Sequence, residues 1–400
     1  MIENDSDIGE DEMEEIDEDD IEEVLDNIVG EGEESEEEDQ NDERDEGPGS
    51  PERDDADFVF QKHTGPVFCC ALEPKNGNLA VTGGQDDMAY VWEIHNGQIL
   101  FECSGHKDSV SMAAFSYDGS YVATGDMSGL IQVWKVATHA LVWSDTVGDL
   151  SWMQWHHGTS ALVAAVTTGE VYMWRIPGGE CKVIPGHAAN SDCGVIMPDG
   201  RRVSVGYSDG AVKVFELKTG AVQGSSAVGE AHSLSVLCIE AFSDNNIIAT
   251  GGADGKINLF KTQPSLKSVW SLSCGEQDDS NTCIETIKFS RDPTLPLLAA
   301  GTLIGILYIL DFTKQTVRHK IQQDCGVCRL VWDCHSPVVF AAGLEGVIRI
   351  YDARNGAKHG QLMGHRESIL DIDLSTDGNT LVSASDDSTC RVYAVSPPER

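Results

Sequence analysis

Residues 79–92 read LAVTGGQDDMAYVW, two apolar runs separated by a polar turn that contains Asp86. Alternating runs around glycine and aspartate predict two antiparallel strands joined by a short turn. The closing pair Val91-Trp92 recurs at Val133-Trp134, Met173-Trp174, Val214-Phe215, Leu259-Phe260, Ile309-Leu310, Ile350-Tyr351 and Val392-Tyr393. The spacings between these pairs are 42, 40, 41, 45, 50, 41 and 42 residues, which is the period of a four-stranded propeller blade. The sequence therefore predicts an all-β propeller of eight blades.

The two ends of the repeated region indicate how the ring closes. After Tyr393 only Ala394 and Val395 precede Ser396-Pro397-Pro398, too short and too rich in proline for a fourth strand. Residues 57–61 (DFVFQ) form an alternating run that belongs to no unit. We expect this run to supply the missing strand and so remove an exposed sheet edge. Seven blades with an irregular insertion is the competing interpretation, because unit six has the weakest pattern.

Charge divides the chain into an acidic tail and a ring. The whole chain has a net charge of −40, and residues 1–57 hold 30 Asp/Glu against 2 Arg. We expect a disordered acidic tail at 1–56, the propeller at 57–396 and a short end at 397–400, because dense like charge opposes collapse. One apolar stripe in the tail could fold onto a partner, fold back onto the propeller or be incidental: Ile21, Val24, Leu25, Ile28 and Val29. A negative chain attracts basic protein segments and repels nucleic acid.

Three apparent chemical motifs are better explained by the repeat than by catalysis. Residues 206–210 (GYSDG) match a nucleophile pattern, but that pattern needs a strand-to-helix turn. Cys325 and Cys328 lack the further ligands of a zinc site, and the repeated histidines occupy one position in their units. We therefore expect no enzyme activity, no metal and no cofactor. The opening residues are acidic and the twelve cysteines are scattered, which favours a cytoplasmic or nuclear protein with reduced thiols.

Five units carry a histidine before their first strand: His63, His106, His187, His232 and His365. With the repeat, these residues make the chain similar to the WD-repeat family over residues 58–395. The resemblance implies a buried hydrogen-bonded set of a histidine, a Ser or Thr of the second strand, an Asp of the next turn and a Trp of the third strand. The implied sets are His63, Thr82, Asp86 and Trp92; His232, Thr250, Asp254 and Phe260; and His365, Ser383, Asp387 and Tyr393. Because phenylalanine has no N–H, unit five is expected to keep only the inner part of the set.

The other units depart from this pattern. In unit two Ser128 stands where the Asp is expected, after His106 and Thr124. In unit four Val205 replaces the hydroxyl residue, and in unit three Asp149 occupies the histidine position. Units six and seven lack the histidine. These units are therefore recognised by period and strand pattern.

Within the WD-repeat family the chain resembles the angio-associated migratory cell proteins and their fungal relatives. The likeness lies in residues 79–87, 100–110 and 122–130, in the stretch DLSWMQWH at 149–156, and in the acidic N-terminal extension. It implies a protein-binding scaffold. The fungal relatives imply a chaperone that holds a basic segment of a large-subunit ribosomal protein, with a role in ribosome biogenesis. The animal members imply adaptors in angiogenesis and cell migration, cytoplasmic or peripheral at the membrane.

Five residues near loops on the histidine-bearing side are candidates to line the partner site: Asp108, Asp126, Trp152, Glu367 and Asp386. Carboxylates beside an aromatic ring would hold Lys or Arg by charge-assisted hydrogen bonds and stacking. Each could instead be an ordinary solvated loop residue. We expect protein partners, no direct nucleic-acid binding, no transmembrane segment and a monomer.

Overall fold

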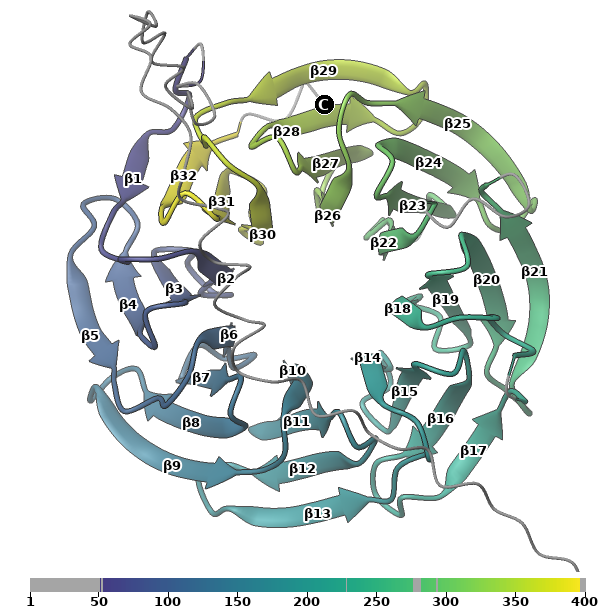
Figure 1. Ribbon diagram of the computed structural model, residues 1–400, viewed down its shortest axis with the longest axis horizontal. Helices are drawn as coiled ribbons and strands as arrows, with labels where there is room; N and C mark the ends of the chain where they lie inside the picture. Colours follow the sequence, from purple (N-terminus) through teal and green to yellow (C-terminus); the bar gives the residue numbers. More distant parts are fainter. Residues whose placement is uncertain (1–50, 52, 228, 276–281, 293, 396–400) are drawn as a thin grey trace, which may run out of the picture. The chain divides into compact units, whose positions relative to one another are not determined.

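The computed structural model describes residues 51–395 except 52, 228, 276–281 and 293. The apolar stripe predicted at residues 21–29 lies outside the described residues. Within the described ranges, thirty-two strands form eight antiparallel sheets of four strands each, arranged as a ring (Figure 1). The prediction of an eight-bladed β-propeller is confirmed.

Each blade runs from an innermost to an outermost strand. Blades one to three are β2 (Val67–Leu72), β3 (Leu79–Gly84), β4 (Ala89–Glu93), β5 (Ile99–Cys103); β6 (Val110–Phe115), β7 (Tyr121–Asp126), β8 (Leu130–Lys135), β9 (Ala140–Thr146); and β10 (Leu150–Trp155), β11 (Ala161–Val166), β12 (Val171–Arg175), β13 (Glu180–Ile184). Blades four to six are β14 (Ser191–Ile196), β15 (Arg202–Tyr207), β16 (Val212–Glu216), β17 (Val222–Ser225); β18 (Val236–Ala241), β19 (Ile247–Gly252), β20 (Lys256–Lys261), β21 (Lys267–Ser273); and β22 (Ile284–Phe289), β23 (Leu297–Thr302), β24 (Ile306–Asp311), β25 (Thr316–Gln322). Blade seven is β26 (Val327–Trp332), β27 (Val338–Gly343), β28 (Ile348–Asp352), β29 (Ala357–Leu362), and blade eight is β30 (Ile369–Leu374), β31 (Thr380–Ser385), β32 (Cys390–Ala394) and β1 (Phe58–Phe60).

Blade eight joins the two ends of the described chain. Strand β1 pairs antiparallel with β32, with Phe58 opposite Val392 and Phe60 opposite Cys390. Contacts continue upstream of the expected start at residue 57, since the Asp55 N–H donates to the Met363 carbonyl at 2.9 Å. The orphan run at 57–61 therefore holds the outermost strand of the last blade.

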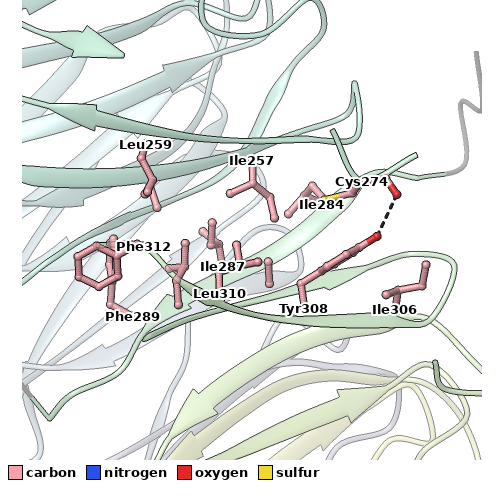
Figure 2. Close-up of a cluster of buried hydrophobic side chains, with 13 residues drawn as sticks. Ile257, Leu259, Cys274, Ile284, Ile287, Phe289, Ile306, Tyr308, Leu310 and Phe312 are labelled. Carbon is pink, nitrogen blue, oxygen red and sulfur yellow. Dashed lines mark hydrogen bonds between the residues drawn. The ribbon is translucent and has the colours of Figure 1, made fainter. Parts of the chain in front are cut away.

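Neighbouring blades pack face to face, and the core lies between them. Figure 2 shows one such cluster, in which Ile257 and Leu259 of blade five meet Ile287 and Leu310 of blade six. Such burial of apolar area is the main stabilising term. Unit six, for which the sequence pattern was weakest, forms a regular four-stranded blade. Its 50-residue spacing reflects longer connections before β22 and between β22 and β23.

The strand directions give the ring two distinct faces. Antiparallel order places the loop before each innermost strand and the turn between the second and third strands on the same side. We call this side the histidine face; in blade one it comprises residues 61–66 and 85–88. The turns between first and second strands and between third and fourth strands form the opposite face.

Candidate functional site

The histidines are held in place by the turns of the histidine face. In blade one, His63 Nδ1 lies 2.9 Å from Asp86 Oδ1 and Nε2 lies 3.0 Å from Thr82 Oγ1. Blade five repeats this arrangement, with 2.9 Å from His232 Nδ1 to Asp254 and 2.7 Å from Nε2 to Thr250. Blade eight does so with 2.9 Å from His365 Nδ1 to Asp387 and 2.7 Å from Nε2 to Ser383. A carboxylate only accepts, so Nδ1–H donates to it and Nε2 accepts the hydroxyl proton.

Burial and hydrogen bonds shift the pKa of several members of the histidine–carboxylate pairs. Burial lowers the pKa of His106 and His365, even though the neighbouring carboxylates act in the other direction. Burial alone would raise the pKa of Asp254, but hydrogen bonds from His232 and the Ser233 N–H lower it to about 2. A neutral imidazole beside an ionised carboxylate is a rigid structural pair. Because both ring nitrogens are occupied, these histidines are poorly placed for acid–base catalysis.

The aromatic member of the implied sets requires correction. Trp92 lies opposite Ala80, whereas Tyr90 lies opposite Thr82. Within the described residues the Trp92 indole N–H has no hydrogen-bond partner. The ring stacks on Phe60 instead, with centroids 4.4 Å apart and planes at 5°. Tyr393 lies opposite Leu381 and is buried, so both side chains contribute apolar burial.

Asp126 also requires correction, because it is fully buried in blade two and cannot reach a partner. It accepts from His106 Nδ1 at 3.0 Å, two positions before the residue that the repeat assigned to this role. Ser128 donates its hydroxyl to the same carboxylate at 2.6 Å. In blade two the structural carboxylate therefore lies at the end of β7, and Ser128 in the following turn hydrogen-bonds to it.

Blade four achieves a related set without a hydroxyl residue. Lys213 Nζ donates to His187 Nδ1 at 3.0 Å, so the ring proton lies on Nε2, which donates to Asp209 at 2.7 Å. Lys213 occupies the third-strand position opposite Val205. In blade five Asn258 occupies the same position opposite Thr250 and lies 3.1 Å from His232 Nε2. The residue at this third-strand position completes the histidine network of its blade. The sequence could have identified it as a polar residue two places before the end of each unit.

The prediction for Trp152 also requires correction. Its side chain is 8% exposed and packs in the core between blades three and four. A Cβ on Gly194 would lie 2.2 Å from the indole ring, so only glycine allows this close approach. Trp152 therefore joins two blades and is not available to stack on a bound cation.

Asp108 and Glu367 are exposed on the histidine face, and Asp386 is half-buried there. Burial and the neighbouring Asp387 raise the pKa of Asp386. Other exposed carboxylates of this face were not among the predicted residues. They are Asp87, Asp149, Glu230 and Asp324. The sequence could have identified them, because they lie in the loops and turns of the histidine-bearing side.

The exposed carboxylates are concentrated along one part of the ring. Five of them lie along the loops and turns from the junction of blades six and seven round to that of blades two and three; we call them the acidic arc: Asp324, Glu367, Asp87, Asp108 and Asp149. The exposed cations of the described histidine-face loops are three: Lys62, Lys107 and Arg366. Exposed apolar side chains lie on the same face, at Met127, Leu234, Leu303 and Ile304. The arrangement offers negative charge beside apolar contact area.

The sequence that resembles a nucleophile motif forms part of a blade. Residues 206–210 form the end of β15 and the turn to β16, where Asp209 binds His187. Among the described residues no group of three or more His, Cys, Asp or Glu side chains is arranged to hold a metal ion. No helix within the described ranges is long and apolar enough to cross a membrane.

Comparison with known proteins agrees with this architecture. The family model of the WD domain, G-beta repeat, matches residues 57–93, 97–135, 225–261 and 356–394. The ribosome assembly protein Sqt1 of Saccharomyces cerevisiae is 24% identical over 384 residues, covering 84% of this chain and 86% of that protein. Its crystal structure superposes with a TM-score of 0.79 at 21% identity, over 86% of this chain and 100% of that chain. Chaetomium thermophilum Sqt1 bound to the N-terminus of the ribosomal protein L10 gives 0.77 at 20% identity, over 86% and 100% of the two chains.

A higher similarity links the chain to animal proteins. It is 40% identical over 358 residues to the angio-associated migratory cell protein of Homo sapiens, covering 87% of this chain and 82% of the relative. The proteins of Pongo abelii and Canis lupus familiaris match at the same 40%. The repeat, the eight blades and this identity together show that the chain belongs to the angio-associated migratory cell protein family of WD-repeat β-propellers.

Proposed function

We propose that this chain is a non-enzymatic chaperone that holds a basic segment of a large-subunit ribosomal protein on its histidine face. The acidic arc is the observation that carries the proposal. Glu367 has no ion-pair partner among the described residues, and the side chain of Asp324 is fully exposed, 3.6 Å from Arg349. Carboxylates that the fold leaves exposed can bind Lys and Arg of a partner by charge-assisted hydrogen bonds.

The apolar residues of the same face support a peptide ligand over a diffuse counter-ion. Met127 is 47% exposed and Leu234 is 52% exposed. A flexible thioether adapts to varied side chains, and Met is used at surfaces that bind peptides. A basic segment with interspersed apolar residues would satisfy both kinds of contact. The relative that was solved with the N-terminus of L10 suggests which ribosomal protein to test first.

A second candidate function is an adaptor in cell migration and angiogenesis, suggested by the 40% identity to the human protein. Both functions use a propeller that binds proteins. We place both in the cytoplasm, with the chain acting as a monomer. They differ in the chemistry of the partner, because a ribosomal segment is basic whereas a cytoskeletal or receptor-proximal partner need not be.

Affinity capture from lysate across a salt series tests the proposal. For a basic ribosomal client we expect recovery that falls steeply between 50 and 300 mM NaCl, because screening weakens exposed charge pairs. The triple variant Asp108→Asn, Asp324→Asn, Glu367→Gln should reduce recovery of L10 about tenfold. Glu102→Gln, an exposed carboxylate on the outer strand β5, is the matched control and should leave recovery unchanged. Salt-insensitive recovery of cytoskeletal or receptor-proximal proteins would favour the adaptor instead.

A further inference from the structure

A groove on the opposite face, between blades three and four, collects positive charge in an otherwise acidic protein. Its volume is about 970 Å³. Its cations are Arg175 at the end of β12, Arg201 in the turn before β15 and Lys218 after β16. All three are exposed, and none has an ion-pair partner among the described residues. The fold therefore leaves these charges free for a ligand.

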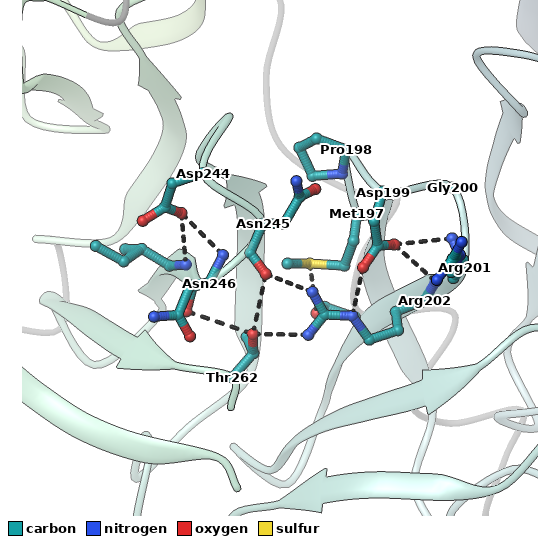
Figure 3. Close-up of polar contacts among 12 residues, drawn as sticks. Met197, Pro198, Asp199, Gly200, Arg201, Arg202, Asp244, Asn245, Asn246 and Thr262 are labelled. Carbon is teal, nitrogen blue, oxygen red and sulfur yellow. Dashed lines mark hydrogen bonds and ion pairs between the residues drawn. The ribbon is translucent and has the colours of Figure 1, made fainter. Parts of the chain in front are cut away.

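The buried Arg202 holds in place the turn that carries its exposed neighbour Arg201. Arg202 is 2% exposed and its Nε donates to Asp199 at 2.7 Å, while Nη1 donates to Thr262 at 2.9 Å (Figure 3). Asp199 also accepts the backbone N–H of Arg201 at 2.8 Å. Arg202 therefore anchors the turn with its charge neutralised, and the turn presents the exposed Arg201 to the groove.

The wall of the groove is firmly built. His156 Nε2 donates to the Gly200 carbonyl at 2.9 Å, and the Gly158 N–H donates to His156 Nδ1 at 3.0 Å. Both ring nitrogens are thus occupied, which fixes a neutral tautomer and joins the turns of blades three and four. His157 repeats the link with 2.9 Å to the Pro198 carbonyl. His156 is a structural wall residue, and the cations of the groove are the two arginines and the lysine.

One carboxylate and three apolar side chains of the groove further define the ligand that it can bind. Glu216 lies in the groove, but its Oε2 accepts the Thr219 hydroxyl at 2.5 Å. Three cations against one carboxylate leave the groove positive. Met173, Ile176 and Leu217 contribute the floor. A ligand that matches both features carries at least two negative groups and an apolar side chain.

We propose that this groove binds an acidic peptide segment of a partner protein, independently of the basic segment on the histidine face. A long nucleic acid is disfavoured, because a chain of net charge −40 repels a polyanion everywhere outside the groove. A single small phosphate would leave most of the groove empty. The lining consists of strand ends and turns, unlike the helix N-terminus that typically holds a phosphate. The propeller thus carries two sites of opposite charge on its two faces.

Fluorescence anisotropy with the full chain tests this assignment. The probe is a fluorescein-labelled synthetic dodecapeptide in which glutamates flank a central leucine, and its counterpart has lysine in place of every glutamate. We expect the glutamate probe to bind at 50 mM NaCl and Arg201→Glu to weaken it at least tenfold. Arg318→Glu, an exposed arginine on the outer strand β25, makes the same charge change elsewhere and should alter binding less than twofold. Glu216→Gln should strengthen binding, and circular dichroism confirms that each variant folds.

Several results would overturn the proposal. They are no binding of the glutamate probe at 50 mM NaCl, equal losses in Arg201→Glu and Arg318→Glu, or displacement of the probe by an RNA oligonucleotide at lower concentration than by unlabelled peptide. The lysine counterpart separates this site from the proposed chaperone site. Arg201→Glu should leave its binding unchanged, whereas neutralising the acidic arc should reduce it. Either site can therefore fail without the other.

Discussion

Closure of the ring depends on the side chain of Phe60 as well as on backbone pairing. Phe60 is 3% exposed and belongs to a cluster that joins β1 and the last blade to blade one. It stacks on Trp92 and meets Tyr90 edge-on, with centroids 5.9 Å apart. Phe60→Ala keeps the three backbone pairs of β1 and removes only this packing. The variant therefore isolates the apolar contribution to closure.

The expected cost follows from the burial of the ring. Returning a buried phenylalanine to water accounts for about 1.5–3 kcal/mol, and the cavity left behind brings such substitutions to about 3–5 kcal/mol. Phe60 lies on the outermost strand of its blade, where neighbouring side chains can partly collapse into the cavity, so we expect a loss of ~3 kcal/mol. A domain has about 5–15 kcal/mol in total. The loss is thus large enough to be measured without abolishing the fold.

Urea unfolding followed by tryptophan fluorescence measures this loss. Val59→Ala is the control, because Val59 is partly exposed on the same strand and has the same kind of backbone pairing. We expect Phe60→Ala to lower the free energy of unfolding by ~3 kcal/mol and Val59→Ala by less than about 1 kcal/mol. If both variants shift the midpoint equally, closure rests on the backbone ladder and the packing argument is refuted.

Three further changes test other parts of the ring. Burial raises the pKa of Asp373 to about 6, so the folded chain holds a proton that the unfolded chain loses above about pH 4, and stability falls as pH rises through that window. Both Asp373 oxygens accept backbone N–H groups, so Asp373→Asn loses one acceptor at every pH. Measured against the wild type, its urea-unfolding free energy should therefore rise by ~1–2 kcal/mol between pH 4 and pH 7.5. Asp387→Asn removes the carboxylate that His365 Nδ1 contacts, and should cost ~2 kcal/mol at pH 7. Burial alone would raise the pKa of Asp387, but His365 lowers it, so urea titrations should show the difference between variant and wild type shrinking below about pH 4. A difference that stays constant with pH would contradict the assignment. Gly194→Val should lower the melting temperature by overlap with the Trp152 ring, at a cost of ~3 kcal/mol, and Trp152→Ala should partly restore it; no restoration would mean that the overlap is not the cause.

The candidate site was only partly predictable, because burial depends on contacts that the sequence pattern does not show. Asp108 and Asp126 both follow the pattern of acidic residues near a loop, yet one is exposed and the other fully buried. The difference is that Asp126 ends strand β7 within reach of His106, a contact between segments 20 residues apart. Trp152 was assigned to the partner site because it lies near a loop on the histidine-bearing side. Its partner Gly194 lies in the next blade, and a single repeat does not reveal that pairing.

The amino-acid sequence by itself determined the number of blades, the positions of their strands and the way in which the ring closes. It could do so because each blade is a local unit whose period and turn residues are written within about 40 residues. Only the tertiary structure decided which carboxylates face solvent, and that Arg175, Arg201 and Lys218 line one groove. The groove arises between blades, where residues some 40 positions apart meet, and Asp126 is held by His106, 20 residues away. Charge exposure therefore depends on packing geometry that the spacing of the repeats does not contain.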